Sequence, residues 1–337
     1  MSVFIFSSEA EIAKRVTKRA GERKFGEAVG LVRNWEELKK HSAKYVIFGI
    51  SEDIGVRANY GNPGTSNAWH AALNVLCNIQ DNELTQSKNV IILGEIDCSE
   101  EMAEAKNRTS KIALGALVEQ IDAKVAEVVA KIVSTGKFPV IIGGGHNNSY
   151  GNLKGTSQAV NKPINCINFD AHTDFRTLEH RHSGNGFSYA FNDRFLDKYF
   201  IFGLHRNYTS EAVFKDLRKH PERIQFNLFE AIKVSQTLPF SEAMQHSEAF
   251  LNEQAFGLEI DLDAIENMGS SAMTPSGFSV AETREFVTHF ATLPNCKYVH
   301  LCEGNPDAGI FPNQVAKMLA YLISDCISLK DQTQNPS

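Results

Sequence analysis

Seven short apolar runs, separated by longer amphipathic or polar stretches, are the feature that most limits what this chain can fold into. The runs occupy residues 45–50, 89–93, 140–142, 164–169, 199–203, 256–260 and 297–302. They are rich in β-branched and aromatic residues and each has the length of one strand. Strands that are apolar nearly throughout need cover on both faces. The sequence therefore predicts an α/β fold with a mostly parallel sheet between helices.

Two stretches have the apolar spacing of covering helices. Between 114 and 133, apolar residues recur three and four positions apart, and Gly136 follows as a helix stop. A second stripe predicts a helix over about 314–329. No break in composition marks a linker, so we expect one domain over residues 1–330 and a disordered polar tail over 331–337.

Composition and charge exclude several classes of protein. Hydrophobic residues make up 42% and charged residues 22% of the 337, which excludes fibrous and disordered chains. The net charge of -6, without a basic block, argues against a nucleic-acid partner. No apolar run approaches the length of a membrane span, and the N-terminus lacks a signal-peptide core. Six scattered cysteines without a C-x-x-C pair indicate reduced thiols, so we expect a cytoplasmic protein.

Residues that bind metals follow three of the predicted strands. PVII is followed by GGGH, INCINF by DAHTD, and FGLEI by DLD. Ligands of open α/β sheets bind beyond the carboxyl ends of the strands, and alternate residues of an extended segment share a face. We therefore expect one pocket to collect the following side chains: His146, Asp170, His172, Asp174, Asp261 and Asp263.

Four carboxylates in one pocket require cations, because their mutual repulsion and desolvation would otherwise be costly. Oxygen and imidazole ligands suit Mn²⁺ or another hard to borderline divalent ion, and six residues suffice for two ions. Each segment alone has an ordinary alternative. His146 could be a turn histidine, DLD a helix cap, and the glycines a phosphate loop, although the P-loop lysine and the G-x-G-x-x-G spacing are absent. Together the three segments predict a binuclear metal centre.

GGGH, NFDAHTD and EIDLD, in this order and at these separations, resemble the arginase, agmatinase and formimidoylglutamase superfamily of binuclear manganese hydrolases. Residues 55–68 and CEGNP at 302–306 resemble two further motifs of that superfamily, so the resemblance covers most of the chain. It implies an arginase-like three-layer α/β/α fold, two Mn²⁺ per subunit and a homo-oligomer, commonly a trimer or hexamer. It also implies two ligand sets: His146, Asp170, Asp174 and Asp261 for one ion, and Asp170, His172, Asp261 and Asp263 for the other, with Asp170 and Asp261 bridging.

The resemblance also implies a mechanism. Two ions lower the pKa of a shared water molecule, which attacks the sp² carbon of an amidine or guanidine. Asp174 would then pass a proton to the leaving nitrogen, a general acid-base role. Glu303, directly after the last predicted strand, would pair with the cationic group of the substrate, although it could instead be a surface acid.

Two residues favour formimidoylglutamate as the substrate. Arginases and agmatinases commonly read GGDH where Gly145 here gives GGGH, which resembles formimidoylglutamases. Arg176 stands where formimidoylglutamases carry an arginine that can grip a substrate carboxylate with two hydrogen bonds. Its alternative is a strand-end arginine paired with an acid of its own chain.

Other residues resemble arginases or depart from both patterns. Ser183 and Asn185 match the SGN motif with which arginases bind the amino-acid end of their substrate, but Phe187 replaces the histidine expected two residues later. GLHRN at 203–207 has basic residues in place of the aspartates of arginases. Asn147 stands where formimidoylglutamases usually have an acid.

The sequence as a whole predicts a hydrolase that converts N-formimidoyl-L-glutamate and water to L-glutamate and formamide, a step of histidine degradation. The first alternative is a guanidine hydrolase that releases urea from arginine, agmatine or a guanidino acid. A non-catalytic family member that serves as a binding subunit is a second. A zinc deacetylase is a third, although such enzymes use one ion and fewer carboxylates.

Overall fold

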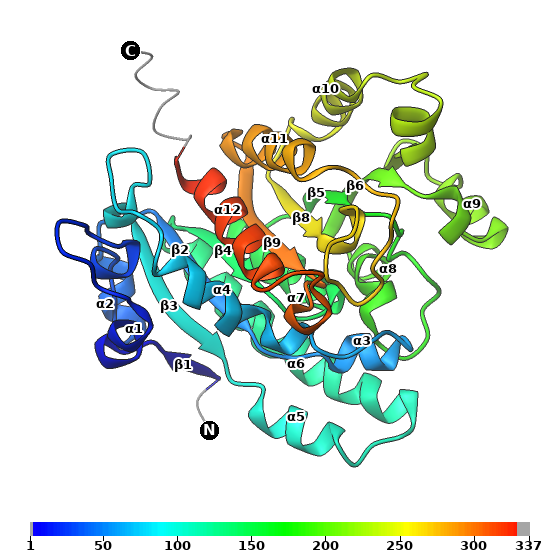
Figure 1. The fold of residues 1–337 in the computed structure, drawn as a ribbon. Helices are drawn as coiled ribbons and strands as arrows, with labels where there is room; N and C mark the ends of the chain where they lie inside the picture. Colours follow the sequence, from blue (N-terminus) through cyan, green and yellow to red (C-terminus); the bar gives the residue numbers. More distant parts are fainter. Residues whose placement is uncertain (1–2, 329–337) are drawn as a thin grey trace.

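The computed structural model describes residues 3–328 and contains one nine-stranded sheet. Every neighbouring pair of strands is parallel except β1 and β3 (Figure 1). The order across the sheet is β1-β3-β2-β4-β9-β8-β5-β6-β7. The strands are β1 (Phe4–Phe6), β2 (Tyr45–Ile50), β3 (Val90–Ile96), β4 (Phe138–Ile142), β5 (Ile164–Phe169), β6 (Leu196–Leu204), β7 (Ile224–Leu228), β8 (Phe256–Asp261) and β9 (Cys296–Cys302).

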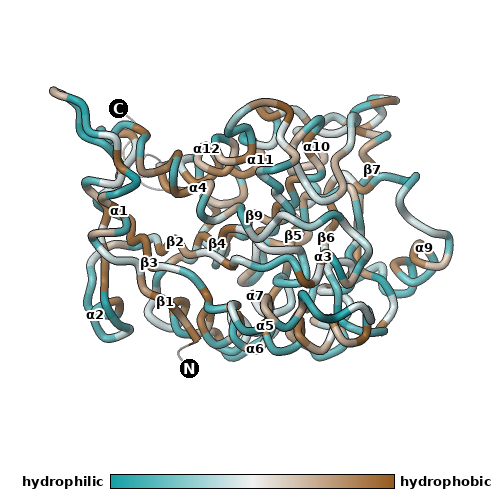
Figure 2. The backbone as a smooth tube through the Cα atoms, turned by 60° about the horizontal axis from the view of Figure 1, so that its bottom comes forward, coloured by the Kyte–Doolittle hydropathy of each residue, from teal (hydrophilic) through white to brown (hydrophobic). Residues whose placement is uncertain are grey.

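Helices cover both faces of this sheet. α4, α10, α11 and α12 lie on one side, and α5, α6 and α7 on the other (Figure 2). The helices are α1 (Glu9–Arg15), α2 (Trp35–Lys40), α3 (Ile54–Ala58), α4 (Ala68–Leu76), α5 (Ser99–Ala105), α6 (Lys111–Ser134), α7 (Ser149–Val160), α8 (Gly186–Asn192), α9 (Glu211–Leu217), α10 (Phe240–Leu251), α11 (Val280–Thr292) and α12 (Gln314–Ser328). The predicted three-layer α/β/α fold with a mostly parallel sheet is confirmed.

The elements predicted from apolar spacing are present. All seven strands form, and the two helices are α6 and α12. Residue 329 and the tail predicted to be disordered, 331–337, lie outside the described residues. None of the helices in residues 3–328 combines the length and the apolarity that crossing a lipid bilayer requires. All six cysteines are buried, and none of them forms a disulfide within residues 3–328.

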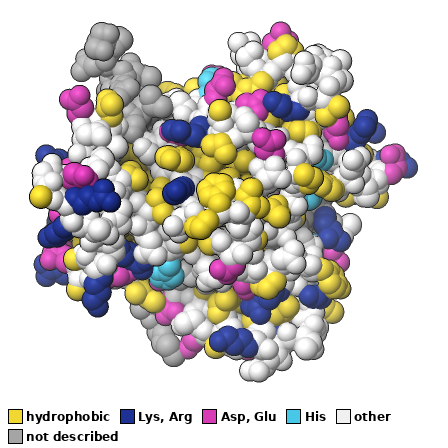
Figure 3. All heavy atoms as spheres, viewed as in Figure 1, with side chains coloured by type: hydrophobic (Ala, Val, Ile, Leu, Met, Phe, Trp, Pro, Cys, Tyr) yellow, Lys and Arg dark blue, Asp and Glu magenta, His cyan; other side chains and the backbone are white. Residues whose placement is uncertain are grey.

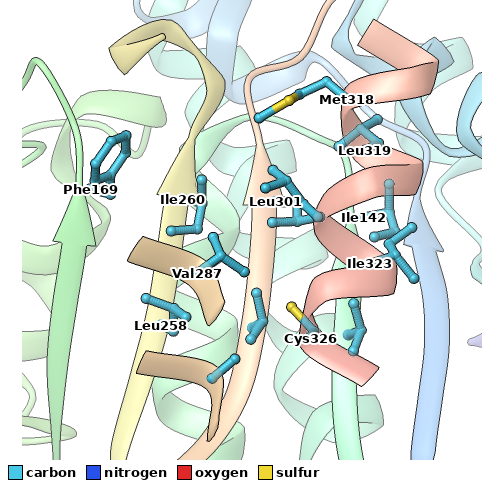
Figure 4. Close-up of a cluster of buried hydrophobic side chains, with 14 of the residues drawn as sticks. Ile142, Phe169, Leu258, Ile260, Val287, Leu301, Met318, Leu319, Ile323 and Cys326 are labelled. Atoms are coloured by element: carbon cyan, nitrogen blue, oxygen red, sulfur yellow. The ribbon is translucent and has the colours of Figure 1, made fainter. Parts of the chain in front are cut away.

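A continuous apolar core fixes the strands that lead to the predicted site. Ile142 of β4, Leu301 of β9 and Ile260 of β8 lie side by side on the face of the sheet that α11 and α12 cover (Figure 4). Met318 and Ile323 of α12 pack onto them from that side. Since each of these side chains is buried, the three strand ends are held at fixed positions.

On the opposite face, α6 packs closely against α7, which begins three residues after His146. The serine at 110 caps α6, accepting a hydrogen bond from the backbone of Ala113. A Cβ on Gly151 of α7 would lie 2.6 Å from Cβ of Val125, and one on Gly155 would lie 2.4 Å from the carbonyl oxygen of Ala126. These two glycines therefore allow the close approach of the helices, and α6 supports the segment that carries His146.

Candidate metal centre

The strand order explains why distant parts of the sequence meet in one place. β4, β9, β8 and β5 are consecutive neighbours in the sheet. His146 follows β4, Glu303 follows β9, Asp261 ends β8 and Asp170 follows β5. Since all four strands are parallel, their carboxyl ends point the same way, and these side chains lie together at that end of the sheet.

The D-x-H and D-x-D spacings form the same local turn after two neighbouring strands. Oδ1 of Asp170 accepts a hydrogen bond from the backbone N–H of His172 at 2.6 Å. Oδ1 of Asp261 accepts one from the backbone N–H of Asp263 at 2.8 Å. An aspartate that binds the backbone two residues on forms an Asx turn, which turns the chain as the strand ends. The second carboxylate oxygen of each aspartate, Oδ2, takes no part in this turn.

The six predicted ligands form two groups of atoms. Nδ1 of His146 lies 2.8 Å from Asp174 Oδ2, 3.2 Å from Asp261 Oδ2 and 3.3 Å from Asp170 Oδ2. Within each group all ligand atoms lie within 4.8 Å of one another. The groups are His146, Asp170, Asp174 and Asp261, and Asp170, His172 and Asp263. Asp170 belongs to both, as a bridging ligand would, whereas Asp261 belongs to the first group only, so its bridging remains a prediction.

The donor atoms fit divalent cations. Both ring nitrogens of His146 are buried and neither is aligned for a hydrogen bond within residues 3–328, although Nδ1 lies within 3.3 Å of three carboxylates and Nε2 lies 3.5 Å from Glu259. Burial raises the pKa of Asp261 well above its usual value, and Asp263 and Asp170 raise it further. The pKa of Asp174 is raised to about 6, first by burial and then by Asp170. Cations between these groups would remove that repulsion, and carboxylate with imidazole is a donor set that Mn²⁺ accepts.

Two of the predicted site residues have strained backbones. The φ angle of Asp174 is 41° and that of Glu303 is 58°. Non-glycine residues in this left-handed region cost on the order of 1–3 kcal/mol each, and such strain collects at functional sites. The fold therefore holds these two carboxylates in orientations that a relaxed chain would not choose.

Glu303 is a buried residue of the site and not a surface acid. Its Oε1 accepts a hydrogen bond from the backbone N–H of His146 at 2.7 Å, and its Oε2 accepts one from the hydroxyl of Ser271. Burial raises the pKa of Glu303 to about 8, although these hydrogen bonds oppose the shift. Sequence reasoning missed Ser271, because it lies in the long connection between β8 and α11 and carries no motif.

A cavity of about 420 Å³ opens over the ligand groups. Metal-binding candidates and Glu303 line it, together with Arg176 and Ser183. Arg176 is the one Lys or Arg that lines this cavity in the described part of the chain. Its Nη1 donates to Oδ1 of Asn59 at 2.8 Å, and Nδ2 of Asn59 donates to Oγ of Ser183 at 3.1 Å. Asn59 thus joins two predicted substrate-binding residues, although no motif singled it out.

Asn185 does not line the cavity. It is fully buried, and its Oδ1 accepts hydrogen bonds from Arg181 and from the backbone N–H of His182. Its Nδ2 donates to the carbonyl of His180 at 3.0 Å. The side chain is therefore engaged in fixing its own loop, whereas Ser183 of the same SGN stretch faces the cavity.

A buried ion pair that sequence reasoning missed holds this loop against α6. Nε of Arg181 lies 2.9 Å from Oδ2 of Asp122, and Nη2 lies 3.2 Å from Oδ1. Nη2 also donates to the carbonyl of Asn147 at 3.0 Å, beside His146. The sequence does indicate this pair, because Asp122 is an acidic residue within the apolar face of α6.

Glu259 is a second buried acid, and it lies behind the ligand groups. Its Oε2 is 3.5 Å from Nε2 of His146 and 2.6 Å from Nδ1 of His300, and its Oε1 accepts from the hydroxyl of Tyr298 at 2.8 Å. Burial opposes ionisation, but His300 and His146 outweigh it and lower the pKa of Glu259 to about 2. A carboxylate on the far nitrogen of a metal-binding histidine fixes its tautomer and orientation.

Comparisons with known proteins agree with this geometry. A family model described as "Arginase family" matches residues 43–328. A formimidoylglutamase from Geobacillus thermodenitrificans is 27% identical over 265 residues, which cover 77% of this chain and 76% of the relative. The structure of formimidoylglutamase from Bacillus subtilis superposes with a TM-score of 0.75 at 18% identity, over 95% of both chains. A Mn²⁺-containing structure of Trypanosoma cruzi formiminoglutamase gives a TM-score of 0.72 at 19% identity, over 91% of this chain and 99% of that one. The structural matches show a common fold.

Proposed function

Because the chain belongs to the arginase family, and so is a metal-dependent hydrolase of amidino C–N bonds, we propose that it hydrolyses N-formimidoyl-L-glutamate. The products would be L-glutamate and formamide, a step of histidine degradation. The proposal is supported by relatives named formimidoylglutamase, which share about a quarter of their residues with this chain. The observation that carries it is the charge of the cavity wall.

The charged side chains of the cavity are arranged for a substrate with two kinds of charge. Two divalent ions would neutralise the four aspartates of the ligand groups. Glu303 and Arg176 then remain as the anionic and the cationic side chain that line the cavity, and Arg176 also lies 3.8 Å from the exposed Glu179, which does not line it. An acid favours the amidinium end of a substrate, and a guanidinium favours a carboxylate. N-formimidoylglutamate carries both groups, whereas agmatine has no carboxylate for Arg176.

We propose that the two ligand groups hold two Mn²⁺ per subunit. His146, Asp170, Asp174 and Asp261 would hold one ion, and Asp170, His172, Asp261 and Asp263 the other. When bound, the metal pair supplies an activated water molecule as the nucleophile. The buried ring nitrogens of His146 support this assignment, because carboxylates surround them but none is aligned for a hydrogen bond.

The chain's own residues then direct the reaction. Glu303 binds the amidinium, because the remaining lone pairs of its carboxylate can accept N–H bonds. Water adds its oxygen to the formimidoyl carbon, and the bond from that carbon to the glutamate nitrogen breaks. The second proton of the water leaves the oxygen as the carbonyl of formamide forms, and it ends on the released amino group. Asp174 takes the proton from the attacking water on a carboxylate oxygen and returns it to the leaving nitrogen. Arg176 holds the distal carboxylate so that the carbon stays near Asp174.

A substrate panel tests this proposal. Mn²⁺-loaded protein is incubated with N-formimidoylglutamate, arginine, agmatine and a short guanidino acid, and formamide and urea are measured separately. Formamide from the first substrate alone is the expected result. Inactivity toward all four by protein that binds two ions would refute the substrate, and protein that binds no metal would refute the mechanism.

A guanidino acid is the second candidate, because Ser183 of the arginase-like SGN stretch lines the cavity close to Arg176. Urea from a guanidine in the same panel would favour this reading. A guanidine hydrolase would then be the first candidate, and a formimidoylglutamate hydrolase the second.

We further propose that the protein is a single-domain cytoplasmic homo-oligomer, a trimer or hexamer. The continuous nine-stranded sheet supports one domain, and cysteines without disulfides in the described residues suit a reducing compartment. Apolar side chains gather over the face that carries α12 (Figure 3), and Ile310, Phe311 and Tyr321 from this part of the sequence are exposed. Exposed apolar patches mark contact surfaces. Light scattering during size-exclusion chromatography would give the mass, and a monomer would contradict the assembly.

A further inference from the structure

Glu52 is a buried acid that the proposed reaction does not use. It lies between β2 and α3 and is fully buried. No Lys, Arg or His in residues 3–328 forms an ion pair with it. Burial raises the pKa of its carboxyl group, although hydrogen bonds from Asn148 and Asn147 oppose the shift. An unpaired buried carboxylate is costly, so its surroundings must compensate for it.

N–H groups provide that compensation, and most of them come from the loop around His146. Oε1 of Glu52 accepts from Nδ2 of Asn148 at 2.7 Å, from Nδ2 of Asn147 at 3.1 Å and from the backbone N–H of Gly145 at 3.2 Å. Its Oε2 accepts from the backbone of Ile54 at 2.7 Å. One carboxylate therefore binds the residue before His146 and the two residues after it.

The space around this carboxylate leaves little room for another arrangement. A Cβ on Gly55 would lie 1.9 Å from Oδ1 of Asn147, and a Cβ on Gly145 would lie 2.6 Å from the same atom. Asn147 is therefore enclosed by two glycines, with its NH₂ group toward Glu52. An aspartate here would have the same shape but would bring a second buried carboxylate next to the first. Like charges at this distance strongly disfavour joint ionisation.

We propose that Glu52 is a positioning residue that fixes His146 for metal binding, and that Asn147 is its obligatory uncharged partner. The pair requires one carboxylate and one amide. Two carboxylates break this interaction. Exchanging the two groups between positions 52 and 147 removes the second carboxylate and restores part of the interaction, because the NH₂ group of a glutamine at 52 would face the backbone N–H of Gly145 or of Ile54. This inference rests on the proposed metal site.

The test is a charge exchange measured by Mn²⁺ affinity. Wild type, Asn147→Asp, Glu52→Gln and the double variant Glu52→Gln/Asn147→Asp are titrated with Mn²⁺, and free Mn²⁺ is read from its electron paramagnetic resonance signal. Thermal unfolding of each metal-free protein is recorded in parallel. Asn165→Asp is the matched control, because Asn165 is equally buried but lies at the start of β5, roughly 16 Å along the strand from Asp170.

We expect Asn147→Asp to weaken Mn²⁺ binding by about 10- to 100-fold, the usual effect of disturbing groups that orient a metal ligand. The double variant should recover part of this loss, because it removes the second buried carboxylate, and Asn165→Asp should bind Mn²⁺ as wild type does. Unchanged affinity in Asn147→Asp, or a double variant as weak as the worse single one, would overturn the proposal.

If Asn147→Asp does not fold, Asn147→Ala replaces it, since this change removes one donor to Glu52 without adding charge. A loss of affinity is again expected, and wild-type affinity would overturn the proposal. A wild type that binds no Mn²⁺ would instead refute the proposed metal site, so the two failures are distinguishable.

Discussion

Replacing Arg181 with methionine should destabilise the protein by about 3–5 kcal/mol, the typical effect of removing one partner of a buried ion pair. The side chain of Arg181 is 2% exposed and that of Asp122 is 4% exposed, so water cannot replace the lost guanidinium. The change also removes the donors to the carbonyl of Asn147 and to the side chain of Asn185. Methionine retains most of the apolar stem, so the loss reports on the polar contacts.

Thermal unfolding followed by circular dichroism measures this effect. For a two-state chain of this length, the expected free energy corresponds to a decrease in Tm of about 4–7 °C. The double variant Asp122→Leu/Arg181→Met is the control, because replacing both members of a buried pair by apolar residues is often neutral or stabilising. It should regain most of the lost Tm.

The decrease in Tm should also depend on pH. Burial outweighs the attraction of Arg181 and raises the pKa of Asp122 to about 6. The folded state therefore binds this proton more tightly than the unfolded state, in which the pKa of Asp122 is about 4. As a result, the contribution of Asp122 to the free energy of unfolding falls as pH rises from about 4 to 6. Without Arg181 the ionised form is less favourable still, so the variant should lose more stability at pH 7.5 than at pH 5.5. A shift below about 1 °C at pH 7.5, or equal shifts at both pH values, would refute this reasoning.

Four further substitutions test the site. Arg176→Ala should lower kcat/KM for a carboxylate-bearing substrate by about 2–3 kcal/mol, roughly 30- to 150-fold, if it makes the charge-assisted pair. Steady-state kinetics measure this, and an unchanged kcat/KM would reject the role. Asp170→Asn and Asp261→Asn should each abolish metal binding and activity, because each is predicted to bridge, and two ions per chain by mass spectrometry would contradict the binuclear assignment. Glu259→Gln should weaken Mn²⁺ binding by about 10- to 100-fold, since Glu259 is the carboxylate beside the far nitrogen of His146. If titration calorimetry gives a wild-type Kd for Mn²⁺, Glu259 does not orient His146 for metal binding.

The sheet was predictable because its strands have local signals. Buried parallel strands need apolar residues on both faces, and seven of the nine strands show such runs. β1 and β7 were missed. β1 has three residues, and β7 is an edge strand in which buried and partly buried positions mix, so neither has a long apolar run.

The sequence by itself determined the six candidate ligands and their chemistry. The spacing within DAHTD and DLD encodes a turn that needs only residues two positions apart, and carboxylates with imidazoles define a metal preference wherever they meet. These properties depend on near neighbours in the chain, so they can be read without a fold.

Only the tertiary structure decided how these residues are supported and which side chains face the substrate. It turned Ser183 toward the cavity and Asn185 toward Arg181, two positions apart in one loop. It paired Glu52 with Asn148 across 96 positions of sequence, and Arg181 with Asp122 across 59. Such pairs leave no periodic trace, because each member is one polar residue whose partner is brought near only when the helices and strands pack.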